Sequence, residues 1–137
     1  MSFLTQQKNG LLYHTSTVLE NGRAVHGFSS RLGGVSEGEF AALNLRGSCA
    51  DSAENVRENY RRFCAALGAS EERAVLSKQV HSDTVRAVTA ADAGKGLLRP
   101  ADYEADALIT DVPGLPLFVF SADCIVILLH DREAGCV

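Results

Sequence analysis

The chain of 137 residues has no tryptophan and a single methionine, and it lacks any run of the ~20 apolar residues that a membrane-spanning helix needs. Its first residues, Met1 to Lys8, do not show the pattern of a signal peptide. Lys and Arg, 13 in all, are scattered and are outnumbered by 17 Asp and Glu, which gives a net charge of −4. We therefore expect a cytoplasmic protein with no membrane and no nucleic acid among its partners.

The spacing of the cysteines argues against a zinc-finger site. Cys49, Cys64, Cys124 and Cys136 form no Cys-x-x-Cys pair, so their spacing does not resemble a zinc finger. Without a secretion signal, a reducing compartment and free thiols are expected.

Length and composition indicate one globular domain, residues 1–137. Apolar residues make up 46% and charged residues 22% of the chain, which is ordinary for a protein with a packed core. The last two residues, Cys136 and Val137, begin a new apolar run directly after a turn. We therefore expect the domain to be truncated at its C-terminal end.

The first third of the chain contains a predicted hairpin and a glycine-rich loop. Strands are expected from Leu11 to Leu19 and from Arg23 to Ser29, joined at Asn21-Gly22. The loop from Arg31 to Gly38 is neither a Walker loop nor a dinucleotide fingerprint. Two interpretations remain open: a turn that needs positive φ, or a loop whose amides and Arg31 approach an anion.

A helix is predicted to begin near Asp51 or Ser52 and to stop at Gly68. Its apolar stripe consists of Val56, Tyr60, Phe63, Cys64 and Leu67. Cys64 is therefore expected in the core.

Five strands are predicted in the second half: Ala74 to Val80, Thr84 to Val88, Asp106 to Thr110, Leu117 to Ser121, and Cys124 to Leu129. The last two form a long apolar run that predicts burial on both faces, interrupted by Ser121-Ala122-Asp123-Cys124. An acid and a thiol in that position indicate either a satisfied structural kink or a site.

His81 and Cys124 are the residues most suited to chemistry. His81 is expected at the end of an apolar strand, where reactive groups are often exposed. An imidazole and a thiolate suit zinc or copper, and they also suit a thiol nucleophile with its base. A catalytic zinc usually has three protein ligands, so a third, either His26 or a residue beyond Val137, is expected.

Several short motifs together resemble the laccase-domain family, also described as multicopper polyphenol oxidase-like or purine nucleoside phosphorylase proteins. They stand in the family's order from about Val25 to the last residue: His26-Gly27-Phe28-Ser29-Ser30-Arg31-Leu32-Gly33-Gly34-Val35-Ser36, Leu43-Asn44-Leu45, Val56-Arg57-Glu58-Asn59, Gln79-Val80-His81, Ala105-Asp106-Ala107-Leu108-Ile109-Thr110, and Ala122-Asp123-Cys124. The chain is similar to the N-terminal portion of such proteins.

The resemblance implies an α+β fold with mixed sheets flanked by helices, related to cysteine hydrolase-like folds. It implies a zinc enzyme, with copper as the alternative metal, that phosphorolyses adenosine, inosine, guanosine and methylthioadenosine and deaminates adenosine. His81 and Cys124 match two of the family's metal ligands and are the expected catalytic residues. The third ligand stands in a later His-Ala-Gly-Trp-Arg-Gly motif, which this sequence lacks, in agreement with the absence of tryptophan.

Residue type suggests further roles in binding purine nucleosides and phosphate. Arg31 is a candidate for the anion, Asn44 and His26 for the nucleoside, and Asp123 for a hydrogen bond that orients its neighbours. Three other functions remain open: a copper-dependent polyphenol oxidase, a metal-free hydrolase that uses Cys124 and His81, and an inactive fragment or interaction module.

Overall fold

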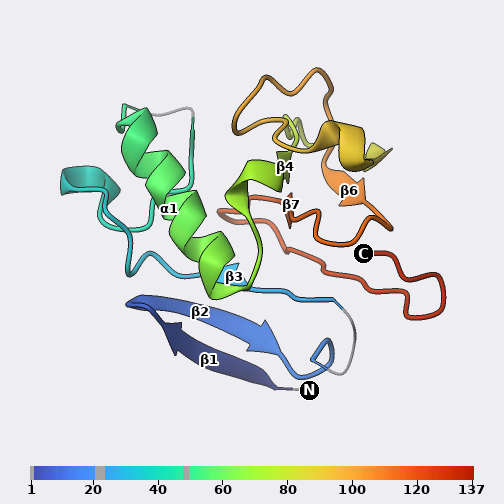
Figure 1. The fold of residues 1–137 in the computed structure, drawn as a ribbon, viewed down its shortest axis with the longest axis horizontal. Coiled ribbons are helices and arrows are strands. Elements are labelled where there is room, and N and C mark those ends of the chain that lie inside the picture. The colour runs from blue at the N-terminus through green and yellow to red at the C-terminus, as the bar shows by residue number, and fades with distance from the viewer. Residues whose placement is uncertain (1, 21–23, 48–49) are drawn as a thin grey trace. The chain divides into compact units, whose positions relative to one another are not determined.

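The structure is a computed structural model that describes residues 2–20, 24–47 and 50–137. It contains one α-helix, seven short strands and three turns of 3-10 helix within those residues, which confirms the predicted α+β class (Figure 1). The chain divides into two compact units, Met1–Glu71 and Glu72–Val137, and each is described by itself. None of the helices in the described part of the chain has the length and apolar character needed to cross a membrane.

The first unit begins with a hairpin that was not predicted from the sequence. Strands β1 (Phe3–Lys8) and β2 (Leu11–Ser16) pair antiparallel, with Lys8 opposite Leu11. Asn9 and Gly10 between them both have positive φ, 53° and 81°, as a two-residue type I′ turn requires. The Asn-Gly signal was therefore present here as well as at Asn21-Gly22.

β2 is the central strand of this sheet. The two residues of β3 (Phe28–Ser29) pair with its other edge, which gives the order β1-β2-β3. The strand predicted from Arg23 to Ser29 is therefore confirmed only at its end, and the predicted turn at Asn21-Gly22 lies outside the described residues. Leu11, Tyr13 and Thr15 alternate on the buried face of β2.

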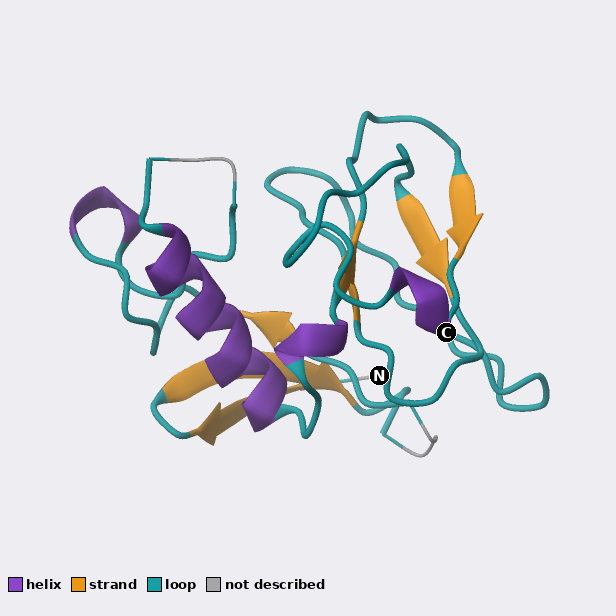
Figure 2. Cartoon of the chain, turned by 45° about the horizontal axis from the view of Figure 1, so that its top comes forward, coloured by secondary structure: helices purple, strands orange, loops and turns teal. Residues whose placement is uncertain are grey.

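Helix α1 (Ala53–Ala66) covers that buried face (Figure 2). Ser52 caps its N-terminus by accepting a hydrogen bond from the Asn55 amide, and Gly68 follows its end with φ of 73°. The ring of Phe63 meets that of Tyr13 edge-on at a centroid distance of 6.1 Å. Cys64, predicted in the core, is 1% exposed.

A buried amide on α1 fixes the glycine-rich loop. Asn59 is fully buried; its Oδ1 accepts from the Val35 amide at 2.8 Å, and its Nδ2 donates to Ser36 Oγ and to the Asn44 carbonyl, each at 2.8 Å. A Cβ on Gly34 would lie 2.1 Å from the Ala42 carbonyl oxygen, so only glycine fits. This close backbone approach supports the interpretation of the loop as a structural turn.

The second unit contains two pairs of parallel strands. β4 (Val75–Leu76) pairs with β7 (Leu117–Phe118), and β5 (Val85–Ala87) pairs with β6 (Ala107–Ile109). Val75, Val88 and Leu115 form its buried core. Among the described residues, the turns of 3-10 helix are η1 (Gly38–Phe40), η2 (Glu71–Arg73) and η3 (Ala90–Asp92).

The predicted strands of this unit are longer than the observed ones. The strand expected from Ala74 to Val80 ends at Leu76. Beyond it, Lys78 makes only an isolated parallel bridge with Glu104, and the Val80 amide donates to the Asp106 side chain. The expected strand from Cys124 to Leu129 has no partner in the described part of the chain. Its predicted burial is wrong, since Ile125 is 90% exposed and Leu129 is 75% exposed.

We predict that Asn59→Ala lowers the free energy of unfolding by roughly 3 kcal/mol, because Val35, Ser36 and Asn44 each lose a hydrogen bond worth about 1 kcal/mol. Urea titration followed by the helical circular dichroism signal reports on this unit, which holds α1. Arg57→Ala on the exposed side of the same helix is the control and should change stability by less than about 0.5 kcal/mol. Equal effects of the two substitutions would show that Asn59 does not hold the loop.

Candidate functional site

The carboxylate of Asp106 holds the turn that carries His81. Asp106 Oδ1 accepts from the His81 amide at 2.9 Å, and Oδ2 accepts from the amides of Val80 at 3.2 Å and Ser82 at 2.9 Å. The Ser82 hydroxyl donates to Oδ2 as well, at 2.9 Å. These bonds, led by the Ser82 amide, lower the pKa of Asp106 to about 2, so the carboxylate is ionised at neutral pH.

The turn is specific in shape because His81 has φ of 61°, a region that residues other than glycine seldom adopt. Successive amides directed at one carboxylate compensate for that conformation. Asp106 is itself fixed by the backbone, since its amide donates to the Thr84 carbonyl at 3.1 Å just before β6. The β5–β6 pair therefore positions the residue that in turn positions His81.

A second side chain connects the His81 turn to the segment that leads to Cys124. Gln79 Nε2 donates to the Phe120 carbonyl at 3.0 Å, and the Phe120 amide donates to Gln79 Oε1 at 2.8 Å. The amide side chain thus pairs with Phe120 as a strand backbone would. Farther along, the Ser121 hydroxyl donates to the Cys124 carbonyl and closes the turn that carries Cys124.

His81 and Cys124 follow adjacent strands of the same small sheet. β4 precedes the His81 turn, β7 precedes the Cys124 turn, and the two strands are parallel neighbours. The carboxyl ends of parallel neighbours lie at one edge of a sheet, where α/β proteins commonly place binding sites. The two strands end earlier than predicted, at Leu76 and Phe118, and the convergence of the two side chains stays a prediction.

We next tested whether the residues present fit a zinc ion. An imidazole and a thiol are suitable donors, and both His81 and Cys124 are exposed. However, across residues 2–20, 24–47 and 50–137 no three His, Cys, Asp or Glu side chains are grouped so that they could hold a metal ion. The two predicted ligands are thus chemically suitable, but the described residues do not provide a complete three-donor set.

Two predicted substrate residues, Arg31 and Asn44, form part of the structure of the glycine-rich loop. Arg31 donates from Nε and Nη2 to the Ala41 carbonyl, at 3.0 and 2.5 Å. Asn44 Nδ2 donates to Asp51 Oδ2 at 2.8 Å, and this bond is the main cause of the lowered pKa of Asp51. Their roles toward phosphate and nucleoside stay predictions.

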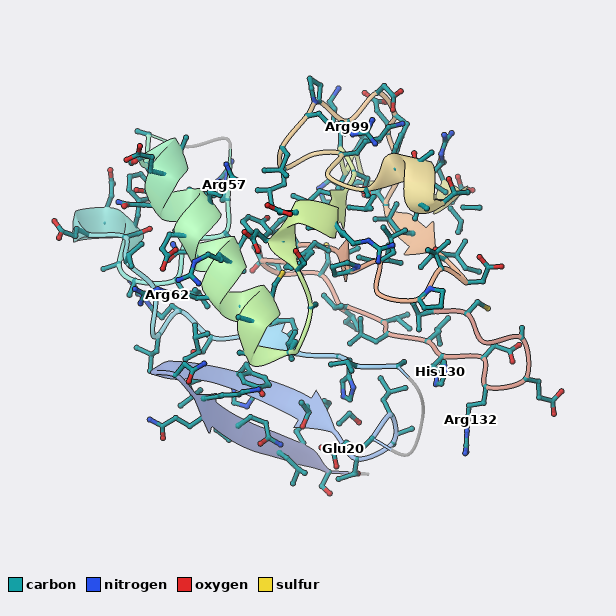
Figure 3. The ribbon with its side chains drawn as sticks, viewed as in Figure 1. Glu20, Arg57, Arg62, Arg99, His130 and Arg132 are labelled. Carbon is teal, nitrogen blue, oxygen red and sulfur yellow. The ribbon has the colours of Figure 1, made fainter. Side chains whose placement is uncertain are left out.

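The third predicted substrate residue, His26, lines an open hollow of about 380 Å³ in the first unit. Its Nε2 accepts a hydrogen bond from the Ser16 amide at 2.7 Å, so the ring proton of the neutral imidazole is on Nδ1. Lys8 and Glu20 line the same hollow (Glu20 is labelled in Figure 3). A role for His26 as substrate contact or third metal ligand also stays a prediction.

The sequence reading did not assign roles to Asp106 and Gln79, although both belong to the quoted motifs. Their contributions depend on backbone amides and carbonyls of residues 24 to 41 positions away. The available signal was an aspartate directly before a predicted strand segment, Ala107-Leu108-Ile109. Gln79 lay inside the strand predicted from Ala74 to Val80, so nothing local marked it.

Comparison with known proteins gives a consistent family. A family model described as multi-copper polyphenol oxidoreductase laccase matches residues 25–137. Purine nucleoside phosphorylases are similar to the chain: that of Corynebacterium glutamicum is 37% identical over 114 residues (80% of this chain, 43% of that protein), and that of Deinococcus radiodurans is 39% identical over 112 residues (82% and 40%).

Solved structures agree with these relatives. The crystal structure of YlmD from Geobacillus stearothermophilus superposes with a TM-score of 0.77 at 30% identity, covering 96% of this chain and 49% of that one. YfiH from Bacillus licheniformis gives 0.75 at 28% identity, covering 88% and 45%. The chain spans about half the length of the curated relatives it matches.

We predict that Asp106→Asn opens the His81 turn, because one carboxylate oxygen is replaced by an amide that cannot accept the backbone hydrogens. Amide hydrogen exchange at His81 and Ser82 should accelerate about tenfold or more. Asp111→Asn, an exposed aspartate of the same unit, is the control. Unchanged exchange in the Asp106 variant would show that the turn holds its shape without the carboxylate.

We predict a large difference in reactivity between two thiols. Burial raises the pKa of Cys64 to about 12, and the negative charge of Glu71 adds to the shift, whereas Cys124 is exposed. Iodoacetamide at pH 8 should therefore modify Cys124 at least about a hundredfold faster than Cys64. Mass spectrometry of the native protein, with the urea-unfolded protein as control, measures both rates. Rapid labelling of native Cys64 would contradict its burial on the inner face of α1.

Proposed function

The chain belongs to the multi-copper polyphenol oxidoreductase laccase family, and on that premise we propose that it forms part of a zinc-dependent purine nucleoside enzyme. The proposed reactions are phosphorolysis of adenosine, inosine, guanosine and methylthioadenosine, and deamination of adenosine, in the cytoplasm. Relatives named purine nucleoside phosphorylases, up to 39% identical, support this assignment. The activity of the whole protein is a proposal, since the chain spans about half of their length.

The single observation that carries the proposal is the placement of His81 and Cys124. Both follow parallel neighbours in one sheet, and Gln79 joins their two segments with a pair of hydrogen bonds to Phe120. These exposed side chains are donors that zinc favours, and we propose that they meet beyond the carboxyl ends of the two strands.

We assign the zinc to His81, Cys124 and a third donor outside the described residues. Bound zinc supplies a Lewis acid that polarises a water or a substrate oxygen near neutral pH. Within this chain, Asp106 fixes the backbone at His81, so the imidazole starts from a defined position and loses little freedom when it binds. The Ser121–Cys124 turn gives the thiol a similar constraint.

The substrate groups are assigned by chemistry. The guanidinium of Arg31 is exposed beside the glycine-rich loop and would attract phosphate. Asn44 and His26 are proposed to contact the nucleoside. Alanine substitution at each position should therefore raise KM for phosphate or for nucleoside more than it lowers kcat.

A second candidate is a metal-free hydrolase in which Cys124 is the nucleophile and His81 is its base. The observation that favours it is the absence of a third metal donor near this pair in the described part of the chain. The two candidates differ in their response to a chelator, which gives a direct test.

We predict that the protein releases hypoxanthine from inosine only when phosphate and zinc are both present, with ribose 1-phosphate as the second product. Liquid chromatography of the base, with zinc measured by elemental analysis, follows both. His81→Ala and Cys124→Ser should each reduce zinc affinity and turnover by about 10- to 100-fold. His130→Gln, at a half-buried histidine of the same unit, should leave both unchanged (His130 is labelled in Figure 3).

Other outcomes would change the assignment. Turnover that survives chelation but is lost in Cys124→Ser would establish the metal-free hydrolase. Oxidation of phenols after loading with copper, without base release, would establish the polyphenol oxidase. Zinc binding without base release from any purine nucleoside would leave the metal site and remove the proposed reaction.

A further inference from the structure

Two hydroxyl groups of the second unit are buried without a hydrogen-bond partner from the protein. They are Ser77 Oγ and Tyr103 Oη, and no group in residues 2–20, 24–47 and 50–137 bonds to either oxygen. A hydroxyl that leaves water on folding is costly to bury unless another group replaces the bonds it gave up. Buried polar atoms of this kind commonly bind an ordered water molecule.

The two hydroxyls belong to neighbouring segments and to the same face of them. Lys78 and Glu104 form an isolated parallel bridge, beside which the Ala105 amide donates to the Lys78 carbonyl at 3.1 Å. The side chains of Lys78 and Glu104 form an exposed ion pair on the outer face. Ser77 and Tyr103 each precede a bridged residue, so they lie side by side on the opposite, inner face.

The ring of Tyr103 is fixed on that inner face. It packs against the buried apolar core of the second unit. Arg86 Cζ lies 4.7 Å from the centroid of the ring, and Lys95 Nζ lies 5.4 Å from it. Both distances are within the range of a cation–π contact. These contacts keep the hydroxyl from turning out into solvent, so its partner has to be enclosed with it.

The chemistry of the place favours water over an ion. Burial raises the pKa of Tyr103, so the phenol keeps its proton at neutral pH. Both hydroxyls are then neutral, and each can donate one hydrogen bond and accept others, as water does. The Lys95 ammonium beside the ring is already paired with Asp92 at 3.0 Å and Asp102 at 2.8 Å, and Arg86 is exposed to solvent. Neither cation therefore requires a buried anion here.

We propose that Ser77 and Tyr103 form a buried water-binding site, in which one water molecule bonds to both hydroxyls and joins their two segments. A water that bridges two protein groups is nearly as favourable in enthalpy as a direct hydrogen bond. It extends the contact between the segments beyond the isolated bridge of Lys78 with Glu104.

This site lies at the base of the His81 turn. Ser77 stands four residues before His81, and Tyr103 stands three residues before Asp106, whose carboxylate accepts from the His81 amide at 2.9 Å. The bound water holds together the two segments on which that bond depends, so Ser77 and Tyr103 are positioning residues for His81. The inference concerns the structure of the turn and does not require the proposed nucleoside chemistry.

The first test is a crystal structure of the 137-residue chain at a resolution that shows ordered water. We expect one water molecule within hydrogen-bonding distance of both Ser77 Oγ and Tyr103 Oη. A direct bond between the two hydroxyls, a separate partner for each, or an enclosed space without water would overturn the proposal.

The second test measures the contact in solution by hydrogen exchange of the Ala105 amide, which donates across to Lys78. Tyr103→Phe keeps the ring and its contacts with the two cations, and Ser77→Ala removes a single oxygen, so both variants should fold. Each should accelerate exchange at Ala105 and at His81 by about tenfold. The double variant should also show about a tenfold effect, because both hydroxyls bind the same water.

Tyr13→Phe is the control, because this tyrosine belongs to the first unit and lines its open hollow. It should leave exchange at Ala105 unchanged. Exchange that is unchanged or slower in Tyr103→Phe would overturn the proposal, because removal of a hydroxyl without a partner relieves the cost of burying it. An effect that multiplies to about a hundredfold in the double variant would overturn it as well, since the hydroxyls would then act separately.

Discussion

The carboxylate of Asp106 accepts the backbone hydrogen bonds that a neighbouring β-strand would otherwise accept. After Leu76 the chain leaves its parallel sheet, and the amides of Val80, His81 and Ser82 would lack partners if one ionised side chain did not accept all of them. That arrangement keeps His81 in a conformation that an isolated peptide would seldom visit. The position of the imidazole therefore depends on a residue 25 positions later in the chain.

The same principle recurs elsewhere in the molecule. Gln79 pairs with Phe120 through its side-chain amide, and in the first unit Asn59 holds the glycine-rich loop with one acceptor and two donated bonds. Each of these side chains satisfies main-chain groups where regular pairing stops. A fold with strands of two to six residues can therefore keep its long loops in defined positions.

The sequence was informative where local signals decide the structure. The helix, its Ser52 cap, its glycine stop and buried Cys64 follow from periodicity and capping preferences, and the ordered motifs predicted the family. Strand lengths were not predictable from the sequence. A segment such as Ala74 to Val80 has the same residues whether its amides donate to a neighbouring strand or to a carboxylate. His81 and Cys124 follow the neighbouring strands β4 and β7, and the predicted convergence of their side chains stays a prediction. The contributions of Asp106 and Gln79 required the three-dimensional structure.

The exposed run from Ile125 to Leu129 also has a consequence for how the protein is made. Five consecutive aliphatic residues without charge, proline or glycine have the composition of segments that stack into intermolecular sheets. An exposed run of this kind is a point at which newly made chains can aggregate. The yield of folded protein in a cell should thus depend on chaperone capacity.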